Sequence, residues 1–248
     1  MKIPTLIAIP HPTISLKKRV FDLLCISLAS LLLIPLMILI ALSIKVVSKG
    51  RGPIFFKQER IGYKGKRFIL WKFRSMQVGA STLVHEKHIT HAMASNLPLS
   101  KLDENDPRLI PLGGLLRSSG LDELPQIINI LRGEMSLVGP RPCLPSEHAL
   151  YLPRHKRRYN SLPGVTGFWQ VNGKNKTTFR EMIAMDLWYA KNKSVTLDVW
   201  IMYRTIPTVS LLMLETLSRV NWTSTIWSAT NRTSTVMNSS LRSKVNAN

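Results

Sequence analysis

The feature that most constrains this chain is an uncharged, mostly apolar run at residues 23–44. Its 22 residues read LLCISLASLLLIPLMILIALSI. A helix of that length crosses the hydrocarbon core of a bilayer, which is roughly 30 Å thick. The run is long for the apolar part of a signal peptide, and no small-residue cleavage site follows it. The sequence therefore predicts a segment that is held in a membrane.

Basic residues flank this run on both sides. They are Lys17, Lys18 and Arg19 before it and Lys45, Lys49 and Arg51 after it. The basic excess beside a spanning helix marks its cytoplasmic end, so both ends are predicted to be cytoplasmic. Pro35, near the middle, removes a backbone hydrogen bond and bends a helix. Together these features predict a re-entrant helical hairpin over residues 17–48, and a kinked transmembrane helix fits them equally well.

The charge balance points to a polyanionic partner. Lys and Arg total 34 against 14 Asp and Glu, a formal net charge of +20. Such an excess suits nucleic acid, an anionic membrane surface or phosphorylated substrates. The chain has only two cysteines, Cys25 and Cys143, and Cys25 lies inside the apolar run. A disulfide framework is therefore not expected, and a reducing compartment fits.

The rest of the chain predicts an α+β, mainly helical fold with a small sheet. A catalytic domain is expected over 49–216, after an extension at 1–16, and a polar, disordered tail over 217–248. Strands are predicted at 54–57 and 67–73 around a turn at 62–65, and a further strand at 168–174. Helices are predicted within 77–105 and at 122–132, 146–160, 178–191 and 195–215. The last carries Trp200, Tyr203 and Arg204 and is expected to lie at the membrane interface as an amphipathic helix.

The stretch SSGLDELPQ at 118–126 places two carboxylates, Asp122 and Glu123, side by side in this basic chain. A purely structural interpretation is a capping box, in which Ser119 and Asp122 begin a helix and the acids complement its dipole. A functional interpretation is a carboxylate pair that binds a divalent metal on a diphosphate, or that attacks phosphorus as a nucleophile.

The surroundings of the pair favour the functional interpretation. Arginines in segments dense with Gly and Pro suit phosphate binding, and five lie in such segments: Arg74, Arg108, Arg117, Arg132 and Arg141. The sequence contains no Walker-type phosphate loop, no dinucleotide-binding glycine motif, no zinc-type cysteine spacing and no nucleophile elbow. His85, His88 and His91 share a spacing of three, but without a clear acidic partner they are read as a solvated helix face.

The order of these motifs resembles the bacterial sugar transferase family, the monotopic polyprenol-phosphate phosphoglycosyl transferases. The matching pieces are KRVFD at 18–22, residues 52–76, residues 106–142, PGVTGFWQVNGK at 163–174 and LDVW at 197–200. They cover most of residues 17–210 in order, and neither tip of the chain. Larger members of the family carry extra N-terminal membrane helices, and this chain resembles the minimal form.

The resemblance implies both an anchor and a mechanism. The family's re-entrant helix favours the hairpin, although Ile34 precedes Pro35 where the family has a serine. The family's catalytic Asp-Glu pair maps onto Asp122 and Glu123. By this resemblance Asp122 attacks the sugar-bearing phosphate of a UDP-sugar and expels UMP, and undecaprenyl phosphate then takes the sugar phosphate. Mg²⁺ is the expected cofactor, with Asp122 and Glu123 as its protein ligands.

Seven further residues are expected to bind the substrates. They are Arg141, which is the strongest candidate, Arg117, Lys72, Arg74, Lys57, Arg60 and Gln170. Trp169 is expected beside Gln170 in the nucleotide pocket. For the basic residues the alternative is contact with anionic lipid headgroups. Asp186 and Asp198 lie on predicted helices and are expected to pair with nearby basic residues.

Two other functions fit parts of the pattern. A membrane-tethered nucleic-acid-binding module explains the charge, but the basic residues are interleaved with Gly-Pro motifs rather than gathered on one helix, so no nucleic acid is expected as a partner. A non-catalytic membrane subunit of a polysaccharide export system is the second alternative. The favoured location is the bacterial inner membrane, with the catalytic domain on its cytoplasmic face. No residue indicates which sugar is transferred.

Overall fold

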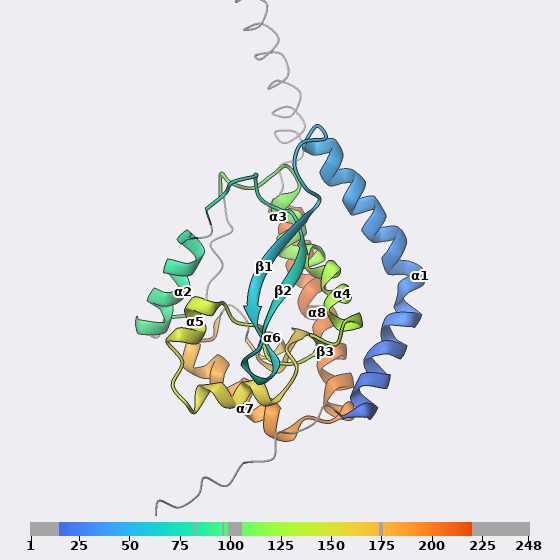
Figure 1. The fold of residues 1–248 in the computed structure, drawn as a ribbon. Coiled ribbons are helices and arrows are strands. Elements are labelled where there is room, and N and C mark those ends of the chain that lie inside the picture. The colour runs from blue at the N-terminus through green and yellow to red at the C-terminus, as the bar shows by residue number, and fades with distance from the viewer. Residues whose placement is uncertain (1–14, 82, 96, 99–105, 174–175, 220–248) are drawn as a thin grey trace, which may run out of the picture.

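The computed structural model describes residues 15–81, 83–95, 97–98, 106–173 and 176–219. The predicted tail over 217–248 and the predicted extension over 1–16 both fall almost wholly outside these residues. Figure 1 shows a central two-stranded hairpin, with the long helix α1 along one flank and α2 along the other. The fold is mainly helical with little sheet, as the sequence predicts.

Helix α1 (Leu16–Val47) is one continuous helix of 32 residues that contains Pro35. It bows outward in the middle (Figure 1), and both of its ends lie against the rest of the molecule. Near its start Asp22 is buried, and near its end Ile40 and Ile44 pack with Phe73 in the core.

Between these ends α1 exposes apolar side chains, among them Leu28 and Leu31 at 79% and 87% exposure. The helix is long and apolar enough to cross a membrane, and only 11% of its most apolar window is buried. A core helix of a soluble protein would be mostly covered, and a cleaved leader would not supply Ile44 to the core. The chain is therefore membrane-associated through α1.

The hairpin consists of β1 (Phe55–Ile61) and β2 (Arg67–Phe73), paired antiparallel from Phe55↔Phe73 to Ile61↔Arg67. The second strand has the bounds that the sequence predicts, and the first is longer than the predicted 54–57. The turn between them holds a short 3-10 segment, η1 (Tyr63–Gly65), in which Lys64 and Gly65 have positive φ.

The middle of the chain is a series of short helices. They are α2 (Leu83–Ser95), α3 (Gly113–Ser119), the 3-10 helix η2 (Leu121–Gln126) and α4 (Ile127–Leu131). Helix α2 confirms that the 77–105 region is partly helical. The predicted helix over 122–132 is confirmed as η2 and α4 together, and it ends at Gly133, whose φ is +78°.

The second half contains a second small sheet, formed by β3 (Ser136–Val138) and β4 (Gly164–Thr166) in parallel. Around it lie α5 (Pro145–Ala149), η3 (His155–Asn160), α6 (Phe168–Val171), α7 (Phe179–Asn192) and α8 (Val195–Arg219). The predicted helices at 178–191 and 195–215 are confirmed by α7 and α8. The single helix predicted over 146–160 is two short pieces, separated around Pro153.

The predicted strand at 168–174 is wrong. Residues 168–171 form helix α6, and the strand of this region is β4, which ends just before it. Four residues reading FWQV alternate too briefly to separate a strand from a helical turn. The tertiary contacts decide the outcome, because Trp169 enters the core while Phe168 stacks on Trp188 with ring centroids 4.5 Å apart.

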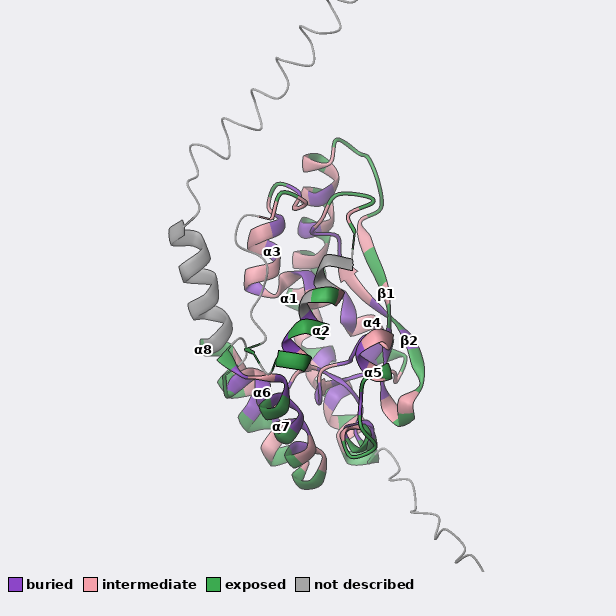
Figure 2. Ribbon diagram, turned by 90° about the vertical axis from the view of Figure 1, so that its left-hand side faces the viewer, coloured by how far each residue is buried: buried purple, intermediate pink, exposed green. Residues whose placement is uncertain are grey.

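Buried ion pairs join distant helices. Asp186 on α7 pairs with Arg158 of η3, and both side chains are 1% exposed. Asp198 on α8 accepts from Lys18 Nζ of α1 at 2.5 Å and from the Tyr189 hydroxyl at 2.7 Å. The expectation that both aspartates pair with basic residues is confirmed. Figure 2 shows buried and exposed residues alternating along α7, as expected for a helix with one side on the core.

Candidate active site

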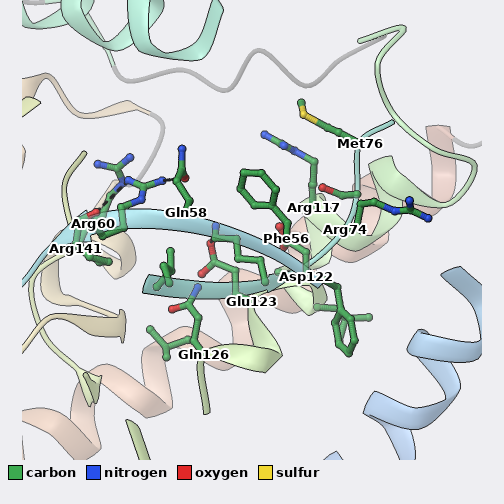
Figure 3. Close-up of a pocket in the computed structure, with 18 of the residues that line it drawn as sticks. Phe56, Gln58, Arg60, Arg74, Met76, Arg117, Asp122, Glu123, Gln126 and Arg141 are labelled. Atoms are coloured by element: carbon green, nitrogen blue, oxygen red, sulfur yellow. Dashed lines mark hydrogen bonds and ion pairs between the residues drawn. The ribbon is translucent and has the colours of Figure 1, made fainter. Parts of the chain in front are cut away.

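The two acidic residues singled out in the sequence line one cavity of about 670 Å³. Asp122 and Glu123 lie in the first turn of η2, and Asp122 is 7% exposed. Gly120, with φ +74° and ψ 7°, ends α3 and turns the chain into η2. A left-handed residue at this corner favours glycine. Figure 3 shows the pair in the middle of the cavity, beside the β1–β2 hairpin.

The capping box predicted for Ser119 does not form. Its hydroxyl donates back into α3, to the Leu115 carbonyl oxygen at 2.6 Å, and accepts only a long bond of 3.4 Å from the Leu121 N–H. The residue at the N-cap of η2 is Gly120. Asp122 still occupies a first helical turn, so the predicted placement is right although the predicted cap is not.

A buried asparagine fixes the acidic pair against the hairpin. Asn129 of α4 is fully buried, and its Oδ1 accepts from the Trp71 N–H at 3.1 Å. Its Nδ2 donates to the Ile69 carbonyl oxygen at 2.7 Å. The side chain thus bonds to the edge of β2 as a neighbouring strand would. From the other side, Arg19 of α1 donates to the carbonyl oxygens of Ile130 and Leu131 at the end of α4.

Lys72 of β2 reaches the second member of the pair. Its Nζ lies 2.7 Å from Glu123 Oε1, and the two side chains are 21% and 33% exposed. Strand β2 therefore supplies a cation directly at the carboxylates. Lys72 is one of the predicted substrate-binding residues, and the structure places it in contact with the acidic pair through Glu123.

A second group of charges lies at one end of the cavity and comprises Arg60, Arg141 and Glu147. Arg141 Nη1 lies 3.2 Å and 3.1 Å from the two carboxylate oxygens of Glu147, and Arg60 Nη1 lies 3.9 Å from Glu147 Oε1. Glu147 is 2% exposed. Burial alone would raise the pKa of its carboxyl, but Arg141 and Arg60 outweigh burial and hold that pKa below its ordinary value.

The arginines in this group remain cationic at neutral pH. Burial, with Arg141 nearby, lowers the pKa of Arg60 to about 10. Burial also acts to lower the pKa of Arg141, but Glu147 outweighs it and the pKa is raised. Arg158 donates to the Arg141 carbonyl oxygen at 2.7 Å, and Asp186 holds the pKa of Arg158 above its usual range although burial opposes this. Three arginines and two carboxylates therefore leave a net positive charge beside the cavity.

The opposite end of the cavity holds other arginines (Figure 3). Arg117 of α3 lines it, together with Arg74 and Arg108. Arg74 Nη2 donates to Ser48 Oγ at 2.5 Å and to the Arg51 carbonyl oxygen at 3.0 Å, so this guanidinium ties the end of α1 to the end of β2. Arg108 pairs with Asp106 at 2.6 Å and donates to the Ser81 carbonyl oxygen. Its hydrogen bond lowers the pKa of Asp106 to about 2.

The remaining predicted residues divide between the cavity and the surface. Gln170 and Trp169 both line the cavity. Lys57 does not line it. Its Nζ lies 4.3 Å from the centroid of the Trp71 ring, and the Arg132 guanidinium makes a second cation–π contact with the same ring. The structure therefore brings together every predicted site residue except Lys57. Three residues that hold the site were missed: Asn129, Glu147 and Arg19. Only Asn129 carried a signal, as the one polar residue in the run IINIL.

The carboxylates fit a metal that the substrate also ligates. Among the residues that the structure describes, no group of three or more His, Cys, Asp or Glu is placed to hold a metal ion. Mg²⁺ commonly binds proteins through one or two carboxylates and completes its octahedron with substrate phosphates and water. Asp122 and Glu123 can supply these two carboxylates, and the other ligands would come from the substrate phosphates and water.

Comparison with known proteins agrees with this geometry. A family model described as bacterial sugar transferase matches residues 13–211, which contain every cavity residue. The chain belongs to the bacterial sugar transferase family.

Its relatives in this family share most of its length. The exopolysaccharide production protein ExoY of Rhizobium meliloti is 40% identical over 202 residues, covering 81% of this chain and 88% of the relative. The UDP-glucose:undecaprenyl-phosphate glucose-1-phosphate transferase of Caulobacter vibrioides is 35% identical, covering 81% and 72%. The undecaprenyl-phosphate galactose phosphotransferase of Salmonella typhimurium is 36% identical, and the match covers 77% of this chain but 40% of that longer protein.

Proposed function

We propose that the protein transfers a sugar 1-phosphate from a UDP-sugar to undecaprenyl phosphate and releases UMP, as the first membrane step in building an exopolysaccharide or related glycan. The observation that carries this proposal is the Asp122–Glu123 pair, set in a cavity between two groups of arginines. Named relatives act on a UDP-sugar or on undecaprenyl phosphate. The arrangement suits a reaction in which every reactant is a phosphate.

The proposed first step is attack by a carboxylate oxygen of Asp122 on the sugar-bearing phosphorus. A new P–O bond forms, the bond from that phosphorus to the oxygen bridging to UMP breaks, and its electron pair leaves with UMP. In the second step a phosphate oxygen of the lipid attacks the same phosphorus. The bond to Asp122 breaks, the carboxylate is restored, and the product is a polyprenyl diphosphate sugar.

Glu123 and the basic residues assist by charge. Lys72 keeps one oxygen of Glu123 in a fixed place, 2.7 Å from Nζ. Arg117 from one end and Arg141 from the other can donate to phosphate oxygens, and arginine forks match phosphate geometry. Asp122 and Glu123 would hold Mg²⁺, which when bound offsets the negative charge of the diphosphate. Arg74 and Lys57 serve other contacts, on the end of α1 and on Trp71.

The anchoring of α1 supports a re-entrant arrangement in the membrane. Arg19 near its start and Ile44 near its end both contact the same globular unit. A straight helix through the bilayer would carry these two ends to opposite sides. The bowed helix, with an apolar outer surface, instead fits insertion into one leaflet from the cytoplasmic face of a bacterial inner membrane.

A second contact with the interface is expected at α8. Trp200 and Tyr203 are 41% and 71% exposed, and the Arg204 guanidinium lies 5.5 Å from the Trp200 ring centroid. Exposed aromatic and basic residues on one helix suit the headgroup layer.

The test of the function is direct. Detergent-purified protein is incubated with UDP-sugars, Mg²⁺ and undecaprenyl phosphate, and UMP release is measured. Asp122→Asn should abolish release, while Glu59→Gln on the exposed side of the hairpin should leave it unchanged. Incubation with a UDP-sugar labelled on its sugar-bearing phosphate, without lipid, should leave label on the protein but not on the Asp122→Asn variant. Undiminished UMP release by that variant would rule out the nucleophile.

A further inference from the structure

The two ends of the cavity differ in their distance from the membrane helix. Figure 3 shows Arg60 and Arg141 at one end, Arg74, Arg117 and Met76 at the other, and Asp122 with Glu123 between them. The second end joins α1 directly, because Arg74 bonds to Ser48, the C-cap residue of α1. The end beside α1 therefore opens where a membrane lipid would first meet the cavity.

This end is also apolar at its rim. Pro53, Phe56, Met76 and Val78 line it, and Phe56 and Val78 are 39% and 68% exposed. Single exposed apolar residues are common, but apolar side chains gathered at the edge of a charged cavity are typical of a ligand-binding groove.

The rim lies one short loop away from the exposed apolar surface of α1. The last turns of α1 expose Leu42 and Val46, at 59% and 75%. Lys45 Nζ bonds to the carbonyl oxygens of Gly50 and Gly52 and folds the following loop against the helix. Val78 packs on that loop so closely that a Cβ on Gly52 would lie 2.6 Å from Val78 Cγ2. The apolar rim of the cavity and the apolar surface of α1 are thus separated only by this short loop, which exposes Lys49 and Arg51.

A lipid with a phosphate head and a long apolar chain matches an apolar rim that leads to an arginine inside the cavity. Its apolar chain would leave the bilayer beside the end of α1 and lie on the rim side chains, and its head would meet Arg117 inside the cavity. Around Arg141 the cavity is lined by the polar and charged side chains of Gln58, Arg60 and Glu147. Apolar residues also line the cavity, but Trp169, Phe179 and Met182 are only 6%, 5% and 1% exposed and form no exposed apolar rim.

We propose that Phe56, Met76 and Val78 form the mouth through which the lipid phosphate acceptor enters, with its first isoprene units on these side chains and its phosphate directed to Arg117. This inference rests on the proposed function and assigns one end of the cavity to one of its two substrates. The soluble UDP-sugar does not use this mouth.

Kinetics of one variant and a matched control test the assignment. Val78→Asp places a charge on the rim, whereas Leu150→Asp places one on a 52% exposed leucine outside the cavity lining. In UMP release assays Val78→Asp should raise the KM for undecaprenyl phosphate about tenfold or more, and that for the UDP-sugar less than twofold. The wild type should prefer undecaprenyl phosphate to a polyprenyl phosphate of only two isoprene units. In Val78→Asp the ratio of the two kcat/KM values should be smaller. Leu150→Asp should change neither KM.

Photo-crosslinking of the wild-type protein provides a test that needs no variant to fold. A polyprenyl phosphate with a photoreactive group in its first isoprene units should label residues 53–57 or 76–81, as mapped by mass spectrometry. Undecaprenyl phosphate should displace the probe, and the same excess of phosphatidylglycerol should not.

Several results would overturn the inference: labelling centred on 141–147, equal displacement by phosphatidylglycerol, or a Val78→Asp variant whose two KM values change equally or not at all. Wild-type protein that releases no UMP with any UDP-sugar would instead refute the proposed function itself. Normal turnover with labelling elsewhere would refute only the acceptor mouth.

Discussion

Replacing Glu147 with glutamine should cost more stability than almost any other conservative change in this chain. The carboxylate is 2% exposed and contacts Arg141 through both oxygens. It also lies 3.9 Å from Arg60 and accepts from the Leu144 N–H at 3.2 Å. An amide would keep the volume, but it would leave the buried guanidinium of Arg60 and the partly buried one of Arg141 without their counter-charge, and it would point an NH₂ group at them.

The size of the effect follows from burial. Removing one partner of a buried ion pair costs about 3–5 kcal/mol, because the other charge remains desolvated. For a chain of this size each kcal/mol moves the melting midpoint by roughly 2–4 °C, so Glu147→Gln should lower it by roughly 6–20 °C. UMP release should fall as well, since Arg141 at the cavity would no longer be held in place.

Glu59 is the matched control. It forms an ion pair with Arg67 at 3.2 Å, but the two side chains are 43% and 67% exposed, and such surface pairs contribute about 0–1 kcal/mol. Thermal melts of both Glu→Gln variants in the same detergent make the comparison. Glu147→Asp, which keeps the charge on a shorter side chain, should melt between wild type and Glu147→Gln. A Glu147→Gln variant that melts like Glu59→Gln would refute the reasoning.

Three further predictions concern packing, pH and the anchor. Gly139→Ala should prevent normal folding, because its Cβ would lie 2.1 Å from the Leu162 carbonyl oxygen, whereas Gly114→Ala, with its nearest atom at 3.9 Å, should leave the melting midpoint unchanged or slightly raised. The pKa values of Glu147 and Asp106 are depressed in the folded state, so the stability they provide is complete above about pH 4.5 and is lost as the pH falls toward about 2. The midpoint should therefore drop on acidification, less steeply in Glu147→Gln, and a wild-type midpoint constant down to pH 3 would contradict this. Asp198→Asn should loosen the start of α1, since Lys18 and Tyr189 both bond to that carboxylate, and faster proteolysis near residue 18 than in Asp198→Glu is the expected readout.

Local patterns in the sequence predicted the elements whose contacts are also local. Strand β2 and helix α7 have nearly their predicted bounds, because alternation and a Thr-x-x-Glu capping box specify them within a few residues. The FWQV segment, by contrast, was wrongly predicted as a strand, since only its contacts with Trp188 and the core decide between the two conformations.

The site shows the same division. The acidic pair and most of the basic residues around it were predicted from their neighbours in the sequence and from the family resemblance. The residues that hold them were not predicted, because each contacts a segment far away in the sequence. Asn129, Glu147 and Arg19 lie 58, 87 and 111 positions from their partners Trp71, Arg60 and Ile130. A separation of that length leaves no periodic trace in a single sequence.

The attachment of α1 at both ends bears on where the sugar goes next. Among the described residues, α1 is the one helix long and apolar enough to span a membrane. Both of its ends contact the unit that carries Asp122. If α1 enters the membrane as proposed, Asp122 meets both of its substrates on the same face of the bilayer. The lipid-linked sugar would therefore be left in the leaflet where it was made, facing the nucleotide pool.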